Sequence, residues 1–439
     1  MKRWTLLAVL LVLLLVQAPL GAQPAPRRVG FAEVAALALE RNLQLRAAAL
    51  DLAIAQAALA QIRATRQPQL SLQASYVSLH QPGTTLTFPN PFSPTPPQLT
   101  VTIPPPEPNQ FLLRLLAQYP LYTGGRLEAQ LSLAEANVRG AQAALERTRQ
   151  QVLAQAQQAY LGWLLSRETV AAAHRHLAQA EESLRVAQAR FRAGTSPRFD
   201  VLQAEVAVAS ARQNLLRAET GVRNAAAQLA SLLDLPLDTP FEPADPLEPR
   251  PVIATLAEGI ARALQRRPEL LELRARSEAA QAAVELARSG ARPNLALTAN
   301  YDLTGPLNQI QGTWSVTLAV TLQLYDGGIT RERVREAELR LEQLRVMEAQ
   351  LRARIELEVR QAWVALEQSG AALLSAEKAV EQAREAARIA AVRFEAGVGT
   401  ALELLSAQAQ LAQAELSLAQ ARFEQNLARL QWLLATGSL

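Results

Sequence analysis

Few side chains in this 439-residue chain are arranged for catalysis or metal binding. The three histidines are His80, His174 and His176. The last two stand two residues apart on a predicted helix and so point to different faces, whereas a helical zinc pair needs a four-residue spacing on one face. No nucleophile elbow, phosphate loop or dinucleotide fingerprint occurs in the sequence. We therefore expect no enzyme, no metal site and no cofactor.

Two glycine pairs suggest a different role. Gly124-Gly125 and Gly327-Gly328 each follow a leucine, a tyrosine and one further residue, and each precedes a long helical pattern. A phosphate-binding loop would also need the lysine and hydroxyl of a P-loop, which are missing. Glycine adopts the dihedral angles of a sharp change in backbone direction at the least cost. We predict that both pairs are strand-to-helix junctions.

Two carboxylates, Asp200 and Glu403, stand just after predicted turns. Each falls in the first turn of a predicted helix, where the helix dipole stabilises negative charge. This position explains both residues without a further role.

The helices that position these residues are very long. Gly125 to Phe191 contains no proline, and its apolar residues recur in steps of four and three, which is the seam of a coiled coil. A helix of about 65 residues is about 100 Å long, so it must be a strut rather than part of a compact core. After Gly194, Ser196-Pro197 opens a returning helix and completes a hairpin.

The chain is a tandem duplication. Leu121 to Gly125 matches Leu324 to Gly328 at an offset of 203 residues, whereas upstream Pro68-Gln69-Leu70 matches Pro293-Asn294-Leu295 at an offset of 225. Because 225 − 203 = 22, the first copy carries about 22 extra residues between its two strands. The predicted segments are a signal peptide (1–22), a first repeat (23–234, tip near 194–198), a proline-rich link (235–253) and a second repeat (254–439, tip near 397–400).

Each repeat begins with a helix, the first from Phe31 to about Arg66, and the sequence period then changes to two. The predicted strands are about 68–78, 111–122, 293–303 and 314–325. Trp314 to Leu324 alternates for eleven residues, about the length of a tilted membrane strand, although a half-buried soluble sheet would alternate in the same way. We expect Gln81 to Gln110, rich in proline and threonine, to be an extended loop.

Four strands per chain cannot stand alone in a membrane. A four-stranded sheet leaves two unpaired edges, and lipid does not tolerate such edges. Known membrane barrels start at about eight strands, so the sheet is also too small to close on itself. Several chains must therefore pool their strands into one barrel.

Composition and charge narrow the location and the partners. Aromatic residues make up only 5%, which favours long helices over several compact cores. The formal charge of +4 falls to 4 − 2 = +2 without Lys2 and Arg3, and both signs alternate along the helices, so we expect no nucleic-acid binding. Residues 1–22 have the charged, apolar and small-residue regions of a secretory signal. The chain has no cysteine, which excludes disulfides and lipid attachment through an N-terminal cysteine.

These features, repeated in this order, resemble the TolC-type outer-membrane efflux proteins. The signal, the duplication, the Leu-Tyr-x-Gly-Gly junctions and the hairpin ends carry the likeness over essentially the whole mature chain. The resemblance implies a coiled-coil all-α protein with membrane β-strands, namely a homotrimer with one shared twelve-stranded β-barrel and an α-barrel through the periplasm. It also implies a passive exit duct of a tripartite efflux or type I secretion system that docks on a periplasmic adaptor and an inner-membrane transporter.

The resemblance also assigns roles at the hairpin ends. Asp200 and Glu403 correspond to acidic residues that constrict the pore in this family. Phe394 and Gly399 stand where a tyrosine and an arginine of a polar latch can occur, so we expect a weaker latch. The residues expected to contact the adaptor are Arg190, Gly194, Ser196, Arg198, Leu202, Arg393, Gly397, Thr400 and Leu405.

The alternative is an exported coiled-coil scaffold or adaptor that never spans the membrane. An adaptor would flank one helical hairpin with compact β-domains, whereas this chain has two hairpins and strands of membrane length. A need for detergent during extraction would separate the two interpretations.

Overall fold

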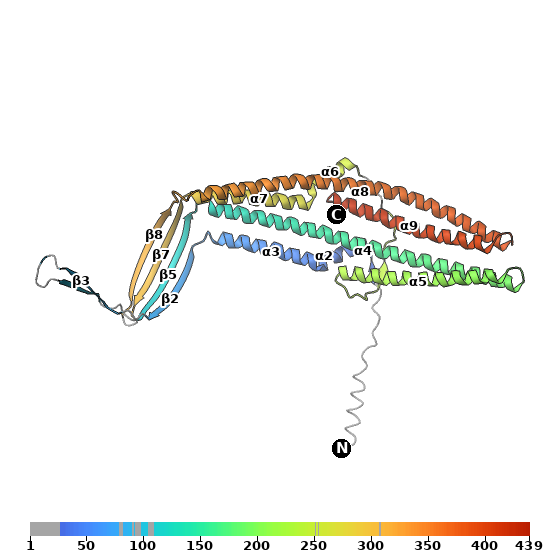
Figure 1. Cartoon of the computed structure of the whole chain (residues 1–439), viewed down its shortest axis with the longest axis horizontal. Coiled ribbons are helices and arrows are strands. Elements are labelled where there is room, and N and C mark those ends of the chain that lie inside the picture. The colour runs from blue at the N-terminus through green and yellow to red at the C-terminus, as the bar shows by residue number, and fades with distance from the viewer. Residues whose placement is uncertain are drawn as a thin grey trace, which may run out of the picture. The chain divides into compact units, whose positions relative to one another are not determined.

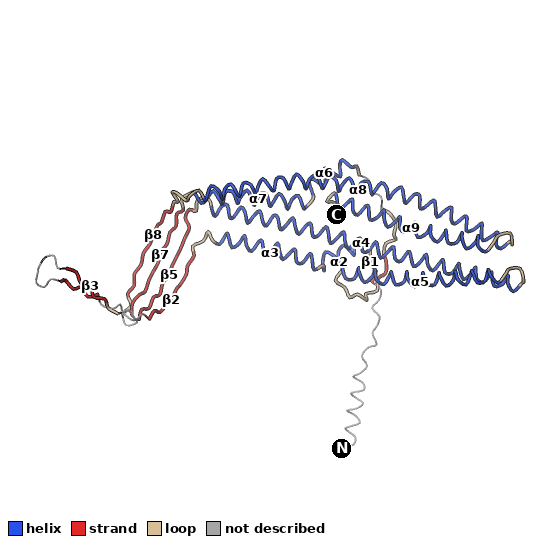
Figure 2. Tube along the Cα trace, in the orientation of Figure 1, coloured by secondary structure: helices blue, strands red, loops and turns tan. Residues whose placement is uncertain are grey.

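The computed structural model describes residues 27–78, 82–89, 92, 98–103, 109–250, 252, 254–306 and 309–439. The predicted signal peptide and His80 lie outside these residues. The long helices are α4 (Arg126–Arg192), α5 (Arg198–Leu232), α8 (Ile329–Glu395) and α9 (Ala401–Ala435) (Figures 1 and 2). The shorter helices are α2 (Phe31–Arg41), α3 (Leu43–Ala64), α6 (Leu256–Arg266) and α7 (Pro268–Arg288), with a 3-10 turn η1 (Ser289–Ala291).

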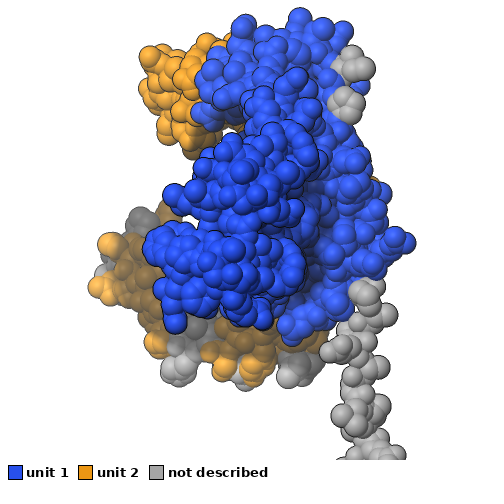
Figure 3. Space-filling model, turned by 90° about the vertical axis from the view of Figure 1, so that its right-hand side faces the viewer, with its two compact units in different colours: residues 1–49, 144–270, 351–439 blue, residues 50–143, 271–350 orange. Residues whose placement is uncertain are grey.

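The chain divides into two compact units, coloured separately in Figure 3. The helical unit comprises residues 1–49, 144–270 and 351–439, and the strand unit comprises residues 50–143 and 271–350. Each unit draws on both copies of the duplication, as expected if equivalent segments of the two repeats pack together.

The strand unit contains a four-stranded antiparallel sheet in the order β2 (Gln69–Ser78), β5 (Asn109–Tyr122), β7 (Asn294–Gly305) and β8 (Gln311–Thr321) (Figure 1). The expected combination of long helical hairpins with four sheet strands is confirmed. Both bounds of the last predicted strand, about 314–325, were wrong, because β8 begins at Gln311, three residues before Trp314, and ends at Thr321. Its pairing with β7 fixes this end, since Asn294, the first residue of β7, pairs with Thr321.

The expectation of an extended loop from Gln81 to Gln110 was also wrong in part. Strands β3 (Thr84–Pro89) and β4 (Gln98–Ile103) pair antiparallel over six residue pairs and form a separate two-stranded sheet, which we call the ribbon. Within the two strands the one proline is Pro89, the last residue of β3, so proline does not interrupt the hydrogen bonds inside the ribbon.

The single helix expected from Phe31 to about Arg66 is two helices. Asn42 adopts an extended conformation, and its side-chain oxygen accepts a hydrogen bond from the backbone N–H of Gln44 at 2.9 Å. The asparagine side chain thus competes with the backbone hydrogen bonds of a continuous helix and caps the next helix instead. In the second copy α6 likewise ends at Arg266, and Arg267 is extended before α7.

The helical unit is built on two apolar clusters, one from each copy. In the first, Tyr160 and Trp163 of α4 are fully buried, and the Tyr160 hydroxyl donates to the carbonyl of Val29 at 2.9 Å. Val29 ends β1 (Arg27–Val29), which pairs in parallel with β6 (Phe241–Pro243) from the proline-rich link. In the second cluster Trp363 of α8 and Trp432 of α9 have ring centroids 5.3 Å apart. These clusters anchor the hairpins α4/α5 and α8/α9.

Candidate functional site

Each glycine pair lies between a strand and a long helix, Gly124-Gly125 between β5 and α4 and Gly327-Gly328 between β8 and α8. Gly124, Gly125, Gly327 and Gly328 all have positive φ, between 63° and 90°. Only glycine adopts such angles without strain, so the residue type follows from the turn.

Each junction starts its long helix with a side-chain cap. The Thr123 hydroxyl accepts a hydrogen bond from the Leu127 N–H at 3.1 Å, and the Asp326 carboxylate accepts from the N–H groups of Gly328 and Thr330 at 2.9 and 2.7 Å. The hydrogen bond from the Thr330 side chain, followed by these backbone bonds, lowers the pKa of Asp326. Thr123 and Asp326 are equivalent positions of the duplication, so the cap is kept while its chemistry differs.

The four-stranded sheet has one apolar and one polar face. Pairs such as Tyr301 with Trp314 and Leu297 with Leu318 place leucine, valine and aromatic side chains on the same side of all four strands. Trp314 is 75% exposed and Val320 69% exposed in the single chain. Such a surface is stable only against lipid or protein.

The polar face carries one ion pair across strands. Arg114 of β5 donates two hydrogen bonds, at 2.8 and 3.0 Å, to the carboxylate of Asp302 directly opposite on β7. Asn300 also donates to Asp302 at 3.1 Å. The face is therefore polar but locally neutralised.

Three polar contacts, which we call the ladder, tie the hairpin α4/α5 to the hairpin α8/α9. Arg175 pairs with Glu415 at 3.0 Å, Ser183 hydrogen-bonds Gln408 through buried side chains at 3.2 Å, and Arg190 donates to the backbone carbonyl of Phe394. The three α4 residues are eight and seven residues apart and thus lie on one face of the helix. Their partners are more than 200 residues away in sequence, which is why local patterns gave no sign of the ladder.

Arg190 makes the contact nearest the hairpin ends. Its guanidinium lies 4.0 Å from the centre of the buried Phe394 ring, and it also donates to the Glu395 carbonyl at 3.2 Å. These carbonyls belong to the last turn of α8, where a cation is favoured by the helix dipole. Arg190, expected as an adaptor contact, therefore donates hydrogen bonds within the chain.

The two predicted gate carboxylates both lie near the ends of the hairpins. Asp200 accepts a hydrogen bond from the Ser196 hydroxyl, and Glu403 lies 4.0 Å from the guanidinium of Arg393. Thr400 caps α9 by accepting from the Glu403 N–H at 3.2 Å. A cavity of about 590 Å³ is lined by residues from both hairpin ends, including Arg190, Asp200 and Thr400.

The other predicted docking residues lie on the same ends. Gly194 and Gly397 have φ of 74° and 80° and form the turns. The remaining members are Arg198, Leu202 and Arg393, which are exposed, and Ser196 and Leu405, which are half-buried. Sequence reasoning overlooked the exposed apolar residues of these ends, which are Phe199, Val398 and Leu402. Phe199 and Leu402 are equivalent in the duplication, and this equivalence was the signal that could have revealed them.

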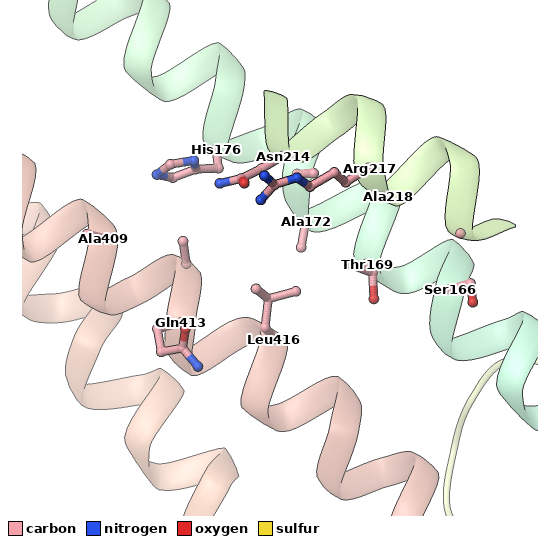
Figure 4. A pocket seen from close by; sticks show the side chains of 13 residues that line it. Ser166, Thr169, Ala172, His176, Asn214, Arg217, Ala218, Ala409, Gln413 and Leu416 are labelled. Carbon is pink, nitrogen blue, oxygen red and sulfur yellow. The ribbon is translucent and has the colours of Figure 1, made fainter. Parts of the chain in front are cut away.

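A further cavity of about 610 Å³ lies within the helical unit between α4, α5 and α9. Figure 4 shows the side chains of His176, Asn214 and Arg217 gathered at one side, with Leu416 and Gln413 of α9 facing them. Much of the rest of the lining is alanine. No group of three or more histidine and carboxylate residues that could hold a metal occurs among the residues described by the structure.

Comparison with known proteins decides the family. The family model described as outer membrane efflux protein matches residues 34–234 and 259–438, which are most of the chain. The chain belongs to this family. It is 27% identical over 328 residues to the outer membrane efflux protein BepC of Brucella suis, covering 73% of this chain and 70% of BepC. It is also 27% identical over 386 residues to the outer membrane protein OprJ of Pseudomonas aeruginosa, covering 85% of this chain and 76% of OprJ.

The fold agrees with this assignment. The structure of the outer membrane protein VceC of Vibrio cholerae matches with a TM-score of 0.75 at 21% identity, covering 93% of this chain and 96% of VceC. The chain is thus an outer-membrane channel protein of the efflux family, and the alternative of a periplasmic scaffold is set aside.

Proposed function

We propose that this chain forms a homotrimer whose sheets join into one twelve-stranded outer-membrane barrel. The observation that carries the proposal is the sheet itself, whose edge strands β2 and β8 lack outer partners among the described residues while its apolar face stays exposed. Neither edge could face lipid. Neighbouring copies that pair β8 with β2 satisfy both edges and leave the polar face inside.

The helices support the same assembly. Helix α3 buries no residue in the single chain, although Leu50 and Ile54 are large, apolar and exposed. It is the one described helix whose length and composition would permit a membrane span, with a mean hydropathy of 1.3. In our proposal it is instead covered by a neighbouring copy in a periplasmic α-barrel built from the repeats 23–234 and 254–439.

The assembled trimer would be a passive duct, with no catalytic or cofactor chemistry of its own. The hairpin ends, with exposed apolar residues such as Phe199 and Leu402, would dock on a periplasmic adaptor and, through it, an inner-membrane transporter. Asp200 and Glu403 would form an acidic constriction at these ends. The ladder would hold the two hairpins of each copy together, and opening would break it.

Conductance of the purified protein in planar bilayers tests the duct and its constriction. We expect Arg190→Ala to raise the open fraction, because the variant loses charge-assisted hydrogen bonds of about 1.5–3 kcal/mol and a cation–π contact of about 0.5–2 kcal/mol, both reduced at this half-exposed site. A net loss of about 1.4 kcal/mol corresponds to about tenfold. Arg192→Ala is the matched control, since Arg192 bonds the Gln188 carbonyl of its own helix.

Charge variants complete this experiment. Asp200→Asn combined with Glu403→Gln should weaken the preference for cations, because it removes the proposed ring of charge. No ion current from the wild type or from any of these variants would refute the duct. Equal effects of Arg190→Ala and Arg192→Ala would leave the duct standing and refute the ladder as its constraint.

A further inference from the structure

The ribbon formed by β3 and β4 has two chemically different faces. Leu86 pairs with Val101 and Thr84 with Ile103, which places Leu86, Phe88, Val101 and Ile103 on one side. These four side chains are between 41% and 49% exposed. The other side consists of paired threonines, Thr85 with Thr102 and Thr87 with Thr100. The ribbon therefore has an apolar face and a hydroxyl face.

Such an element is not stable without a partner. An isolated two-stranded hairpin is at best marginally stable in water, and neither edge of this one has a further strand beside it in the described part of the chain. Exposed edges are usually protected by charged side chains. Between Arg66 and Glu107 the sequence contains no Asp, Glu, Lys or Arg at all. Something must cover the apolar face.

The missing charge narrows the choice of partner. A segment that rests on an anionic lipid surface usually carries Lys or Arg, and a charged protein partner would need complementary charge. The ribbon offers neither. Identical uncharged ribbons from other copies match it in both polarity and size.

Chain connectivity brings such copies together. The ribbon is joined to β2 after Ser78 and to β5 before Asn109, and β2 is an edge strand of the sheet. In the proposed trimer that edge is the boundary between copies, so each ribbon emerges beside a neighbour. Five residues separate Ser78 from Thr84, enough to span about 16–18 Å.

We propose that the apolar faces of the three ribbons pack against one another and cap the outer mouth of the duct. The inference rests on the proposed trimer and adds to it a contact between copies outside the barrel. It makes the 22-residue difference between the repeats an added closure at the end of the sheet that is opposite the strand-to-helix junctions.

Cysteine cross-linking tests the cap, because the chain has no native cysteine. Leu86→Cys and Val101→Cys place thiols on the apolar face, and Thr85→Cys and Thr87→Cys are matched controls on the hydroxyl face. The full-length protein in outer-membrane vesicles is treated with a short bifunctional maleimide and separated in denaturing gels. We expect the apolar-face variants to give severalfold more covalently linked chains than the hydroxyl-face controls.

A seam control separates this proposal from the trimer. A double variant, Gln73→Cys on β2 with Ser315→Cys on β8, should link neighbouring copies through the barrel wall. Seam links without ribbon links would refute the cap alone, and absence of both would refute the trimer as well. Equal linking from both ribbon faces would refute the assigned packing face.

The partner is checked in the same variants. An environment-sensitive fluorophore on Leu86→Cys that is quenched by brominated lipid, with no links between chains, would assign the face to the membrane and overturn the proposal. Leu86→Asp should raise conductance severalfold by placing like charges between the ribbons, whereas Thr87→Asp should not.

Discussion

The two strand-to-helix junctions offer a comparison in which the same substitution meets different surroundings. Gly124 and Gly327 are equivalent in the duplication and have φ of 63° and 68°. A Cβ atom added at Gly327 meets nothing within 4 Å, whereas one at Gly124 lies 2.8 Å from the Arg292 Cβ and 3.2 Å from the Pro293 carbonyl oxygen. These neighbours are close to the backbone or part of it, so they cannot swing aside.

The expected costs follow from these contacts. Positive φ costs an alanine about 1 kcal/mol at either site. At Gly124, overpacking adds about 1–3 kcal/mol, giving about 2–4 kcal/mol for Gly124→Ala. With an unfolding entropy of about 2.1 cal/mol/K per residue, 1 kcal/mol shifts the Tm of a cooperative chain of this length by about 1 °C. We therefore expect losses of about 1 °C for Gly327→Ala and about 2–4 °C for Gly124→Ala.

Thermal unfolding in detergent, followed by the helical circular dichroism signal, measures this difference. Gly125→Ala is the control for position, since its added Cβ lies 2.9 Å from the flexible end of Arg292 only. It should behave like Gly328→Ala, which has comparable φ and more space. Equal Tm losses for Gly124→Ala and Gly327→Ala would refute the packing argument and leave dihedral strain as the only cost.

Three further predictions concern the buried tyrosine, the acidic cap and the apolar sheet face. Tyr160→Phe should cost about 0.5–1.5 kcal/mol, because it removes one hydrogen bond to the Val29 carbonyl, which keeps its bond from the Ala244 N–H. Burial raises the pKa of Tyr160 to about 12, so the stability that this tyrosine contributes is complete below pH 10, its unfolded value, and is lost as pH rises through 12. Denaturation of the variant and the wild type should therefore show a difference in stability at pH 8 that becomes smaller at pH 12. Asp326→Ala should lower the Tm at pH 7 but not at a pH well below 3.8. The pKa of this carboxylate is lowered in the folded protein, so its contribution to stability is present above the unfolded pKa and is lost as pH falls through the folded pKa. Thermal unfolding at the two pH values checks this. Val316→Arg, at the centre of β8 on the apolar face, should reduce barrel stability in vesicles by about 2–4 kcal/mol, whereas Thr317→Arg on the polar face should cost much less. Urea titration of both variants measures these losses, and a larger loss for Thr317→Arg would contradict the assignment of the faces.

Local periodicity predicted most of this fold because long helices and strands repeat one pattern many times. The heptad seams gave α4 and α8, and the alternation around Trp314 gave β8 apart from a shift of three residues. The shift arose because alternation continues beyond Thr321, and only the pairing with β7 determines where the strand stops. The residues of a strand do not by themselves encode where it ends, because the end depends on pairing with the neighbouring strand.

The ribbon was missed for another reason. The many prolines of residues 81–110 pointed to an extended loop, yet Leu86 and Phe88 alternate with threonines just as Val101 and Ile103 do. A proline such as Pro89, at the end of a strand, does not prevent that strand from pairing. Position within the segment, rather than composition, should have decided the prediction.

In the ladder, residues at equivalent positions of the duplication make different contacts. Arg190 and Arg393 are equivalent in sequence, and the motif around them suggests equivalent roles. In the structure Arg190 binds the end of α8 in the other hairpin, while Arg393 lies beside Glu403 of its own hairpin. Among the described residues this contact is therefore made once, from Arg190 of the first hairpin to the end of α8 in the second.

This asymmetry bears on how the hairpins separate. The contacts are an arginine–carboxylate pair, a serine–glutamine pair and an arginine bound to carbonyl oxygens, and none of them includes a histidine. Histidine is the side chain that ordinarily changes its charge between pH 5 and 8. A small change of pH near neutrality therefore gives these contacts no reason to break. In our proposal, mechanical force or binding energy at the exposed apolar ends opens them instead, and control of the duct would lie with whatever docks there.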